Sequence, residues 1–371
     1  MAEEDDLDAL VVRAPDNVLY LTNFWGMKGY DAAVFPRQGE PTLICLEASA
    51  EDAARTAWTE DVVYLRGYAP DDPRPPFART LELAQEAARE YERVGLELSL
   101  GTQASDRMVG EPTTYTAAWF AGFGDGARDA TPLLAKARAT KTAQELERMR
   151  LANEIAAAAM EHARNYIRPG ITEAQAAALW ESFVHGEGTG WKGQVELALP
   201  FSLVWSGPGI KTFTATTDRP VVDDAPTLFE IWVCADGYWC DHTKNLCPGE
   251  PSAEYRRLEE QLLVVYDGIL DRCTPGASLA ELDRQAREAI ADAGYPGQPS
   301  HPLCHGVGAR AHEPPYAHQA GTGTVEEGMV LAIEPGIYWD GGGGLRVEDN
   351  FLITADGAEK LSSFPDGIVR A

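Results

Sequence analysis

Four carboxylates and one histidine in the C-terminal half of the chain have the residue types of a metal site. Glu230 and Asp241 are eleven residues apart, separated by two apolar runs and a turn sequence, Ala235-Asp236-Gly237. Because a hairpin of this length brings side chains of adjacent strands close together, we expect these two carboxylates to converge. The other three candidates lie downstream in separate, glycine-containing motifs: His305, Glu334 and Glu348.

The two downstream glutamates each interrupt an apolar run that is typical of a strand. Glu334 lies in VLAIEPGIY and Glu348 in LRVEDNFLIT. A buried carboxylate is costly unless it is paired or bound to a metal. An ion pair, for example Arg346 with Glu348, would explain one such glutamate. Two of them, together with the Glu–Asp pair and a glycine-flanked His305, favour a metal site.

The donor set also narrows the choice of metal. Carboxylates with one imidazole suit a divalent ion such as Mn, Fe(II), Co or Zn. Five ligands, of which four are anionic, exceed what one catalytic zinc usually takes. They fit two ions about 3.5–4 Å apart. We therefore expect two divalent ions, with a single-metal site as the alternative.

Two helix pairs are expected to carry these motifs. The segment from Lys141 has helical apolar spacing, ends at Arg168-Pro169-Gly170, and is followed by a capping box of Thr172 and Gln175. The same design of helix, Pro-Gly, cap and helix recurs 106 residues later around Thr274-Pro275-Gly276. Each unit precedes a candidate hairpin region. The C-terminal part is therefore predicted to consist of two similar α/β halves.

The N-terminal part has a different sequence pattern, in which short strand-like and helical segments alternate. DAAVFPR and PTLICLE flank a turn and predict a hairpin, helices are expected over about 48–58 and 77–91, and DATPLLAKAR is strand-like. This alternation indicates an α/β domain with a largely open sheet, in which we find no catalytic constellation. We predict two domains, residues 1–138 and 139–371.

The charge of the chain excludes several classes of partner. Its 58 acidic and 31 basic residues give a formal net charge of −27. This argues against nucleic acid and against anionic membranes, because binding to either needs clustered Lys and Arg. The apolar runs are too short to span a membrane. The first residues, MAEEDD, are acidic where a secretory signal would be basic and then apolar, so a cytoplasmic location is expected.

The six cysteines show no CxxC pairing, and their apolar neighbours predict reduced, buried thiols. They are Cys45, Cys234, Cys240, Cys247, Cys273 and Cys304.

Around the candidate metal ligands the sequence resembles the M24 (pita-bread) metallopeptidase family, in the branch that contains Xaa-Pro aminopeptidase, prolidase and creatinase. The motifs GYWCD, HGVGARAHEPP, AIEPG and LRVED recur in the family's order, with a carboxylate eleven residues before Asp241. NVLYLTNF is similar to the start of a creatinase-type N-terminal domain, and KTAQELERMRLA to the entry of a pita-bread catalytic domain. The resemblance implies this two-domain α/β (α+β) fold, with two pseudo-symmetric halves in the catalytic domain.

The resemblance also implies roles for the metal ligands. His305 would bind one ion, Asp241 and Glu348 would bridge two ions, and Glu334 would bind metal. Glu230 occupies the position of the first ligand, where the family has Asp. Its extra methylene is a large displacement in a site whose productive geometry is held to about 0.5 Å. Whether Glu230 binds a metal is therefore open.

Four residues would take part in catalysis by the same resemblance. Glu334 would handle the proton of the nucleophilic water, and His312 would stabilise the tetrahedral intermediate. His301 and Arg346 match positions of the proline-specific members. For His312 the alternative is an ordinary loop histidine.

One family feature is missing. Family members carry a substrate-contacting histidine upstream of the first ligand, in the stretch that reads SGPGIKTFTATTDRP here, and this stretch has no histidine. Phe213 or a neighbour occupies the approximate position. Four tryptophans near the motifs could line a pocket, although core packing is the simpler explanation for each one: Trp205, Trp232, Trp239 and Trp339.

These features predict a metal-dependent hydrolase of the Xaa-Pro peptidase type, which would cleave an amide in a small peptide with a metal-bound hydroxide. The alternative is a non-peptidase of the same fold, a creatinase-like or ectoine-hydrolase-like hydrolase or lyase of a small metabolite. The glutamate at position 230 and the missing histidine favour that alternative. A binding protein without activity is a third possibility. The resemblance implies a homodimer.

Overall fold

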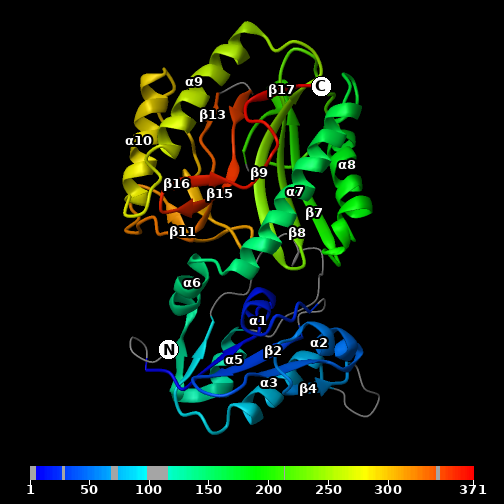
Figure 1. Cartoon of the computed structure of the whole chain (residues 1–371), viewed down its shortest axis with the longest axis vertical. Coiled ribbons are helices and arrows are strands. Elements are labelled where there is room, and N and C mark those ends of the chain that lie inside the picture. The colour runs from blue at the N-terminus through cyan, green and yellow to red at the C-terminus, as the bar shows by residue number, and fades with distance from the viewer. Residues whose placement is uncertain (1–5, 27–29, 68–73, 98–115, 213, 340–342) are drawn as a thin grey trace. The chain divides into compact units, whose positions relative to one another are not determined.

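The computed structural model describes residues 6–26, 30–67, 74–97, 116–212, 214–339 and 343–371 (Figure 1). Contacts between Cα atoms divide the chain into two units, Met1–Arg138 and Ala139–Ala371. Each unit has its own sheets and its own buried hydrophobic clusters.

The first unit is built on a six-stranded mixed sheet in the order β4-β3-β2-β1-β5-β6. β1 pairs antiparallel with β2 and parallel with β5. The strands are β1 Ala9–Val12, β2 Ala32–Pro36, β3 Thr42–Leu46, β4 Val62–Leu65, β5 Val94–Leu96 and β6 Ala127–Asp129. The helices are α1 Pro15–Thr22, α2 Ala50–Thr56, α3 Pro76–Ala87, α5 Thr116–Phe123 and α6 Thr131–Ala139, with 3₁₀ turns at Glu47–Ser49 and Gly124–Gly126.

Helices cover both faces of this sheet, and β1 is therefore buried on both sides. Leu10 and Val12 pack in one cluster with residues of α1, α2 and α6. Val11, which alternates with them, packs in a second cluster with Ala84 of α3 and Trp119 of α5. The α/β class predicted for the N-terminal part is confirmed.

The prediction that DATPLLAKAR is strand-like was wrong. Only Ala127–Asp129 is a strand, and Thr131–Ala139 is helix α6. Pro132 lies in the first turn of this helix, where its missing N–H costs no hydrogen bond. The two buried side chains, Leu134 and Arg138, are four residues apart and lie on one face of the helix.

The second unit has two main sheets and two helix pairs (Figure 1). One sheet has the order β17-β9-β8-β7 and the other β11-β10-β12-β15-β16, with β13 and β14 as a separate pair. The helices are α7 Ala143–Tyr166, α8 Glu173–Phe183, α9 Ala253–Leu270 and α10 Leu279–Asp292, with short helical turns at Val184–Gly188, Trp191–Gly193 and Gly207–Gly209. The strands are β7 Ala198–Ser206, β8 Thr227–Ala235, β9 Tyr238–Cys247, β10 Cys304–Gly306, β11 Glu313–Ala317, β12 Val330–Ile333, β13 Gly336–Tyr338, β14 Gly344–Arg346, β15 Asp349–Thr354, β16 Gly357–Lys360 and β17 Ile368–Arg370.

Each helix pair packs against one of the two sheets. α7 and α8 bury Ile155 and Trp180 against the β7–β9 side, whereas α9 and α10 bury Leu262 and Leu282 against the sheet that contains β12 and β15. The predicted organisation into two similar halves is confirmed.

The predicted helix starts are also present. Thr172 and Gln175 form a reciprocal capping box at α8, with N–H donors satisfied at 3.1 and 2.9 Å. Ser278 caps α10 by accepting from Glu281 N. Both caps satisfy main-chain N–H groups that have no partner within the helix.

The hairpin of β8 and β9 has the turn that its sequence predicts. Asp236 and Gly237 have φ of 48° and 86°, as a type I′ turn requires. Along β8, Phe229, Ile231 and Val233 pack with the cluster that contains α7 and α8. Glu230 alternates with them, so it lies on the opposite face of the sheet.

All six cysteines are free and buried, as predicted. In the part of the chain that the structure describes, no helix is long and apolar enough to cross a membrane. The cytoplasmic location stays a prediction.

Candidate metal centre and active site

The register of the β8–β9 hairpin brings Glu230 and Asp241 to one face of the sheet. Trp232 is the cross-strand partner of Asp241, and Glu230, two residues before Trp232, pairs with Thr243. Glu230 and Asp241 are therefore diagonal neighbours on the face opposite α7 and α8. The hairpin and the shared face that the spacing predicts for the two carboxylates are present.

The other candidate ligands come from the second sheet. His305 lies on β10, which pairs with β12, and Glu334 follows directly after β12. Glu348 lies just before β15 and forms an isolated antiparallel bridge with Thr243 of β9. Thr243 Oγ1 also donates to Glu348 Oε2 at 2.6 Å. The candidate site therefore lies where the two halves of the second unit meet.

Within the described residues, two overlapping groups of possible metal ligands result. One contains Asp241, His305 and His312, and the other contains His305, Glu334 and Glu348, with ligand atoms within 4.8 Å of one another in each group. His305 Nε2 lies 3.5 Å from Asp241 Oδ2 and 3.6 Å from Glu334 Oε1. His305 Nδ1 lies 2.9 Å from Gly306 O, so a proton on Nδ1 leaves the Nε2 lone pair directed at the site.

The electrostatics of this cluster fit a divalent cation. Burial and the charges of Glu348, Glu334 and Glu230 raise the pKa of Asp241 well above its usual value. Burial and Glu348 do the same to the pKa of Glu334, and burial raises the pKa of Glu348 to about 7. A bound cation would offset the repulsion among these carboxylates.

Unpartnered buried atoms support the same conclusion. Among the described residues, both carboxylate oxygens of Asp241 and Nε2 of His305 are buried without an aligned hydrogen-bond donor or acceptor. The Trp232 indole N–H acts to lower the pKa of Asp241 but makes no hydrogen bond within the described residues. Buried polar atoms are rarely left in this state unless an ion or water satisfies them. The residues present therefore fit a metal centre.

Glu230 differs from the other candidate ligands. Its Oε2 lies 2.8 Å from Arg346 Nη2, and it is in neither ligand group of the described chain. Arg346 is 2% exposed, donates to Thr243 Oγ1 at 2.6 Å and lies 3.6 Å from Glu348. The structure thus brings Arg346 to both glutamates, with Glu230 as the nearer partner. The pairing with Glu230 was not foreseen from the sequence.

His301 and Arg346 are connected by a tyrosine. Arg346 Nη1 donates to Tyr338 Oη at 3.3 Å, and Tyr338 Oη lies 3.1 Å from His301 Nε2. His301 Nδ1 lies 3.4 Å from Glu334 Oε2. Burial and the charge of Arg346 lower the pKa of His301 to about 3, so its ring is neutral and can accept from the tyrosine.

Tyr338 was missed in the sequence, where it looks like one more apolar residue of VLAIEPGIY. Its position four residues after Glu334 was a signal in the sequence that Tyr338 could lie near the site.

His312 is held at the mouth of the site by neighbouring rings. Its side chain is 46% exposed, and its Nε2 lies 3.5 Å from Asp241 Oδ2. The ring stacks on His305, with centroids 4.3 Å apart, and approaches Trp232 at 6.1 Å. The side chain of His312 is therefore accessible from solvent, in contrast to the buried candidate ligands.

The aromatic residues near the motifs have different surroundings. Trp232 lies between Phe201 and His312 and borders the site. Trp205 packs in a small apolar cluster, and Trp339 contacts Tyr255 at 5.6 Å. Phe213, the residue at the approximate position of the missing histidine, lies outside the described residues.

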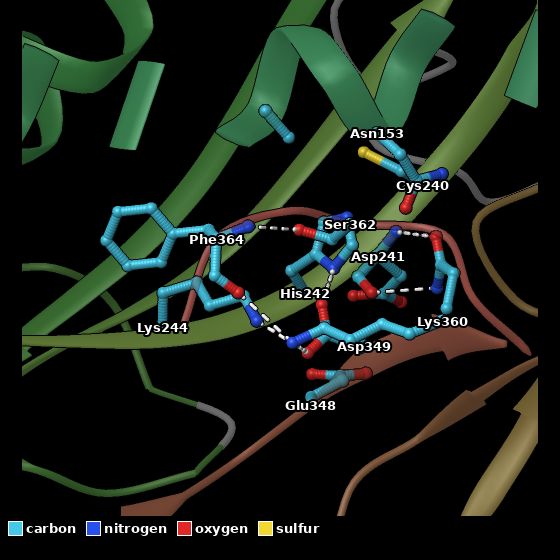
Figure 2. Close-up of polar contacts among 12 residues, drawn as sticks. Asn153, Cys240, Asp241, His242, Lys244, Glu348, Asp349, Lys360, Ser362 and Phe364 are labelled. Atoms are coloured by element: carbon cyan, nitrogen blue, oxygen red, sulfur yellow. Dashed lines mark hydrogen bonds and ion pairs between the residues drawn. The ribbon is translucent and has the colours of Figure 1, made fainter. Parts of the chain in front are cut away.

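A buried ionic cluster adjoins the candidate site through the alternate residues of β9 (Figure 2). His242 and Lys244 alternate with Asp241 and Thr243 along β9, and both lie near Asp349. Lys244 Nζ is 2.6 Å from Asp349 Oδ2, and Lys360 Nζ is 2.9 Å from it. Burial would raise the pKa of Asp349, but Lys244 and the contact with His242 hold it far below its usual value. Asp349 is therefore ionised and paired.

Comparisons with known proteins agree with this geometry. Residues 147–355 match Metallopeptidase family M24, and residues 1–108 match the Creatinase/Prolidase N-terminal domain. The chain is 28% identical over 361 residues to an Xaa-Pro dipeptidase of Lactobacillus delbrueckii subsp. lactis, covering 96% of this chain and 92% of the relative.

Solved structures with the same fold include a prolidase from Pyrococcus furiosus, at 26% identity, a TM-score of 0.77 and 98% coverage of both chains. An Xaa-Pro dipeptidase from Bacillus anthracis has a TM-score of 0.81 at 22% identity, with 100% of this chain and 96% of that chain covered. At that identity the second likeness shows the fold alone.

Proposed function

This chain belongs to metallopeptidase family M24, and from its site we propose that it hydrolyses the peptide bond before proline in Xaa-Pro dipeptides or short Xaa-Pro peptides. The observation that carries the proposal is the cluster of Asp241, His305, Glu334 and Glu348 with an adjoining chain of Arg346, Tyr338 and His301. A bound divalent ion supplies activation of water and polarisation of the scissile carbonyl. The relatives named Xaa-Pro dipeptidase and prolidase support the substrate class.

The chain's own residues then have distinct tasks. Glu334 belongs to one of the two candidate ligand groups, which places it to accept a proton from the attacking water and return it to the leaving amine. His312, half-exposed beside Asp241, is placed to donate to the oxygen of a tetrahedral intermediate. Arg346 orients Glu230 and Tyr338 and keeps a positive charge beside the carboxylates.

We propose one firmly bound ion, held by Asp241, His305, Glu334 and Glu348. A second ion needs Glu230, whose carboxylate is engaged by Arg346 at 2.8 Å. Because this carboxylate must first be released from Arg346 or shared with it, the second ion would bind more weakly than the first. Mn, Co, Zn and Fe(II) all suit the donor set. Homodimer formation remains part of this proposal, by resemblance to the family.

A second candidate function is hydrolysis or lysis of a small non-peptide metabolite. It is favoured by two observations together. Glu230 is paired with Arg346 outside the ligand groups of the described chain, and residues 186–241 contain no histidine that could contact a scissile amide.

The test is turnover by the purified protein after measured loading with Mn²⁺ or Co²⁺. Xaa-Pro dipeptides, Xaa-Pro tripeptides and matched Xaa-Ala dipeptides are compared, with metal content determined on the same samples. Preferential hydrolysis of Xaa-Pro substrates is expected. Bound metal without hydrolysis of any of these peptides would contradict the peptidase proposal and favour the metabolite enzyme.

A further inference from the structure

The two sheets of the second unit meet along a seam between residues 241–245 of β9 and residues 346–350, which run from the end of β14 into β15. We call this the sheet seam. Its one isolated main-chain bridge in the described chain joins Thr243 to Glu348. In antiparallel register, this bridge places Asp241 opposite Asn350 and Asn245 opposite Arg346. Asp241 and Glu348, both candidate metal ligands, thus lie on opposite sides of the seam.

At the Asp241 end, a side chain takes the place of a strand. Asp241 N donates to Asn350 Oδ1 at 3.0 Å, and Asn350 Nδ2 donates to Asp241 O at 2.9 Å. The main-chain groups of Asp241 thus point away from Trp232, its partner on β8. Asn350 is 0% exposed, so water cannot replace these two bonds. The carboxamide fixes the backbone from which the Asp241 carboxylate projects.

The other end of the seam has a similar crossing with one hydrogen bond instead of two. Asn245 Nδ2 donates to Arg346 O at 2.8 Å, and Asn245 is 1% exposed. Two residues to either side of the Thr243–Glu348 bridge, an asparagine therefore crosses between the sheets. One asparagine holds the main chain of a metal ligand, and the other holds that of the arginine that pairs with Glu230.

The ionic cluster of Figure 2 joins the same strands through the alternate residues. His242 Nδ1 lies 3.1 Å from Asp349 Oδ1, and Lys244 Nζ lies 2.6 Å from Asp349 Oδ2. A buried ion pair of this kind is costly to break, since it leaves an uncompensated charge. This cluster holds the strands together, whereas Asn350 contacts the ligand residue itself.

We propose that Asn350 is a positioning residue of the metal centre, acting through the main chain of Asp241. The inference rests on the metal centre of the proposed function. Aspartate has only two side-chain torsions between backbone and carboxylate, so a shift of its backbone moves the carboxylate directly. Metal sites require geometry within about 0.5 Å, and the seam has one main-chain bridge to maintain it.

The experiment compares Asn350→Ala with Asn153→Ala in metal-free full-length protein. Asn153 is a matched control because it is also 0% exposed and donates to a main-chain carbonyl, Met149 O, at 2.8 Å within α7. Calorimetric titration with Mn²⁺ measures affinity, and the visible spectrum of the Co²⁺ form reports ligand geometry. We expect Asn350→Ala to weaken Mn²⁺ binding about 10–100-fold, as loss of outer-shell partners does, and to shift the Co²⁺ bands. Asn153→Ala should retain both.

A thermal midpoint for each variant separates positioning from general destabilisation. The proposal is overturned if Asn350→Ala matches Asn153→Ala in Mn²⁺ affinity and Co²⁺ spectrum while both lose stability. If Asn350→Ala does not fold, Asn350→Asp replaces it. This variant keeps the acceptor for Asp241 N and loses the donor to Asp241 O, so a smaller band shift is expected and an unchanged spectrum overturns the proposal.

These measurements need no substrate. A wild-type protein that binds Mn²⁺ but hydrolyses no Xaa-Pro peptide would contradict the proposed function and leave the positioning role testable by affinity and spectrum. A wild-type protein that binds no divalent metal would overturn both.

Discussion

The two strands of the β8–β9 hairpin each present one carboxylate to the same face, yet the two carboxylates have different surroundings. Asp241 on β9 is 1% exposed, and its Oδ2 lies 3.5 Å from Nε2 of both His305 and His312. Glu230 on β8 is less buried and pairs with Arg346 at 2.8 Å. A shared face therefore does not make two carboxylates equivalent. The neighbours that each strand meets decide which one is available to a metal.

The difference also has an electrostatic side. Burial is the main cause of the raised pKa of Asp241, and the charges of Glu348 and Glu334 raise it further. In the metal-free protein the ionised Asp241 carboxylate is therefore repelled by its neighbours. Glu230 has a cation within ion-pair distance. A bound cation would supply a counter-charge to the β9 carboxylate, whereas the β8 carboxylate already has one in Arg346.

The largest expected effect is that of Asp241→Asn. Loss of the ligand charge should lower hydrolysis by about a thousandfold or more, because the metal supplies several kcal/mol of transition-state stabilisation. The same change should raise the thermal midpoint of the metal-free protein, since it removes a buried repulsive charge. Activity assays and thermal unfolding with and without Mn²⁺ measure both effects.

Asp236→Asn is the control for Asp241→Asn, since Asp236 lies on the same hairpin but accepts main-chain hydrogen bonds from Glu196 and Leu197 at the turn. It should leave metal binding unchanged. If Asp241→Asn retains wild-type metal affinity, the distinction between the two strands fails.

Glu230→Asp tests the other side of the comparison. The shorter side chain should loosen the pair with Arg346 and free the carboxylate for a second ion. We expect bound Mn²⁺ to rise toward two per chain and Xaa-Pro hydrolysis to rise by about tenfold, an effect of about 1.4 kcal/mol. Metal analysis and steady-state kinetics check this.

Glu230→Gln, which keeps the length and removes the charge, should show neither gain. Unchanged metal content in Glu230→Asp would show that the pairing with Arg346 does not limit the second ion.

The smallest expected effect is on the pH dependence of stability. The folded-state pKa of Glu348 is raised to about 7, and those of Asp241 and Glu334 are raised too. For a raised carboxyl pKa, the stabilising contribution is complete below the unfolded pKa, near 4.5, and is lost as the pH rises through about 7. The thermal midpoint of metal-free protein should therefore fall by about 5–10 °C between pH 5 and pH 8.

Saturating Mn²⁺ should abolish most of this fall, because the cation replaces the protons. A metal-free midpoint that does not fall over this range would contradict the crowding of carboxylates around Asp241.

Much of the site could be predicted from residue types and spacing. The positions of Asp241, His305, Glu334 and Glu348 follow from motifs, and the hairpin turn follows from Asp236-Gly237, whose positive φ angles the sequence favours. These features are local, so a short stretch of sequence contains the information. The α6 segment shows the limit of local reading, since its alternating apolar residues fit a strand until Leu134 and Arg138 are seen on one helix face.

Contacts across the sheet seam could not be predicted in the same way. Asn350 and Asp241 are 109 residues apart, and Arg346 and Thr243 are 103 apart. The sequence shows Asn350 as a polar residue in an apolar strand and Tyr338 as an apolar one, with no indication of their partners. Such pairings depend on how two sheets pack, which no local pattern encodes.

The sequence by itself determined the candidate ligand types, the two-half design and the family to which the chain belongs, because each rests on residue identity and short-range spacing. Only the tertiary structure decided which of the two carboxylates is paired with an arginine. Glu230 and Asp241 are equivalent by spacing, but Arg346 reaches one, whereas His305 and His312 reach the other. The physical reason is that burial makes each charge depend on its nearest opposite charge, and that neighbour comes from the second sheet.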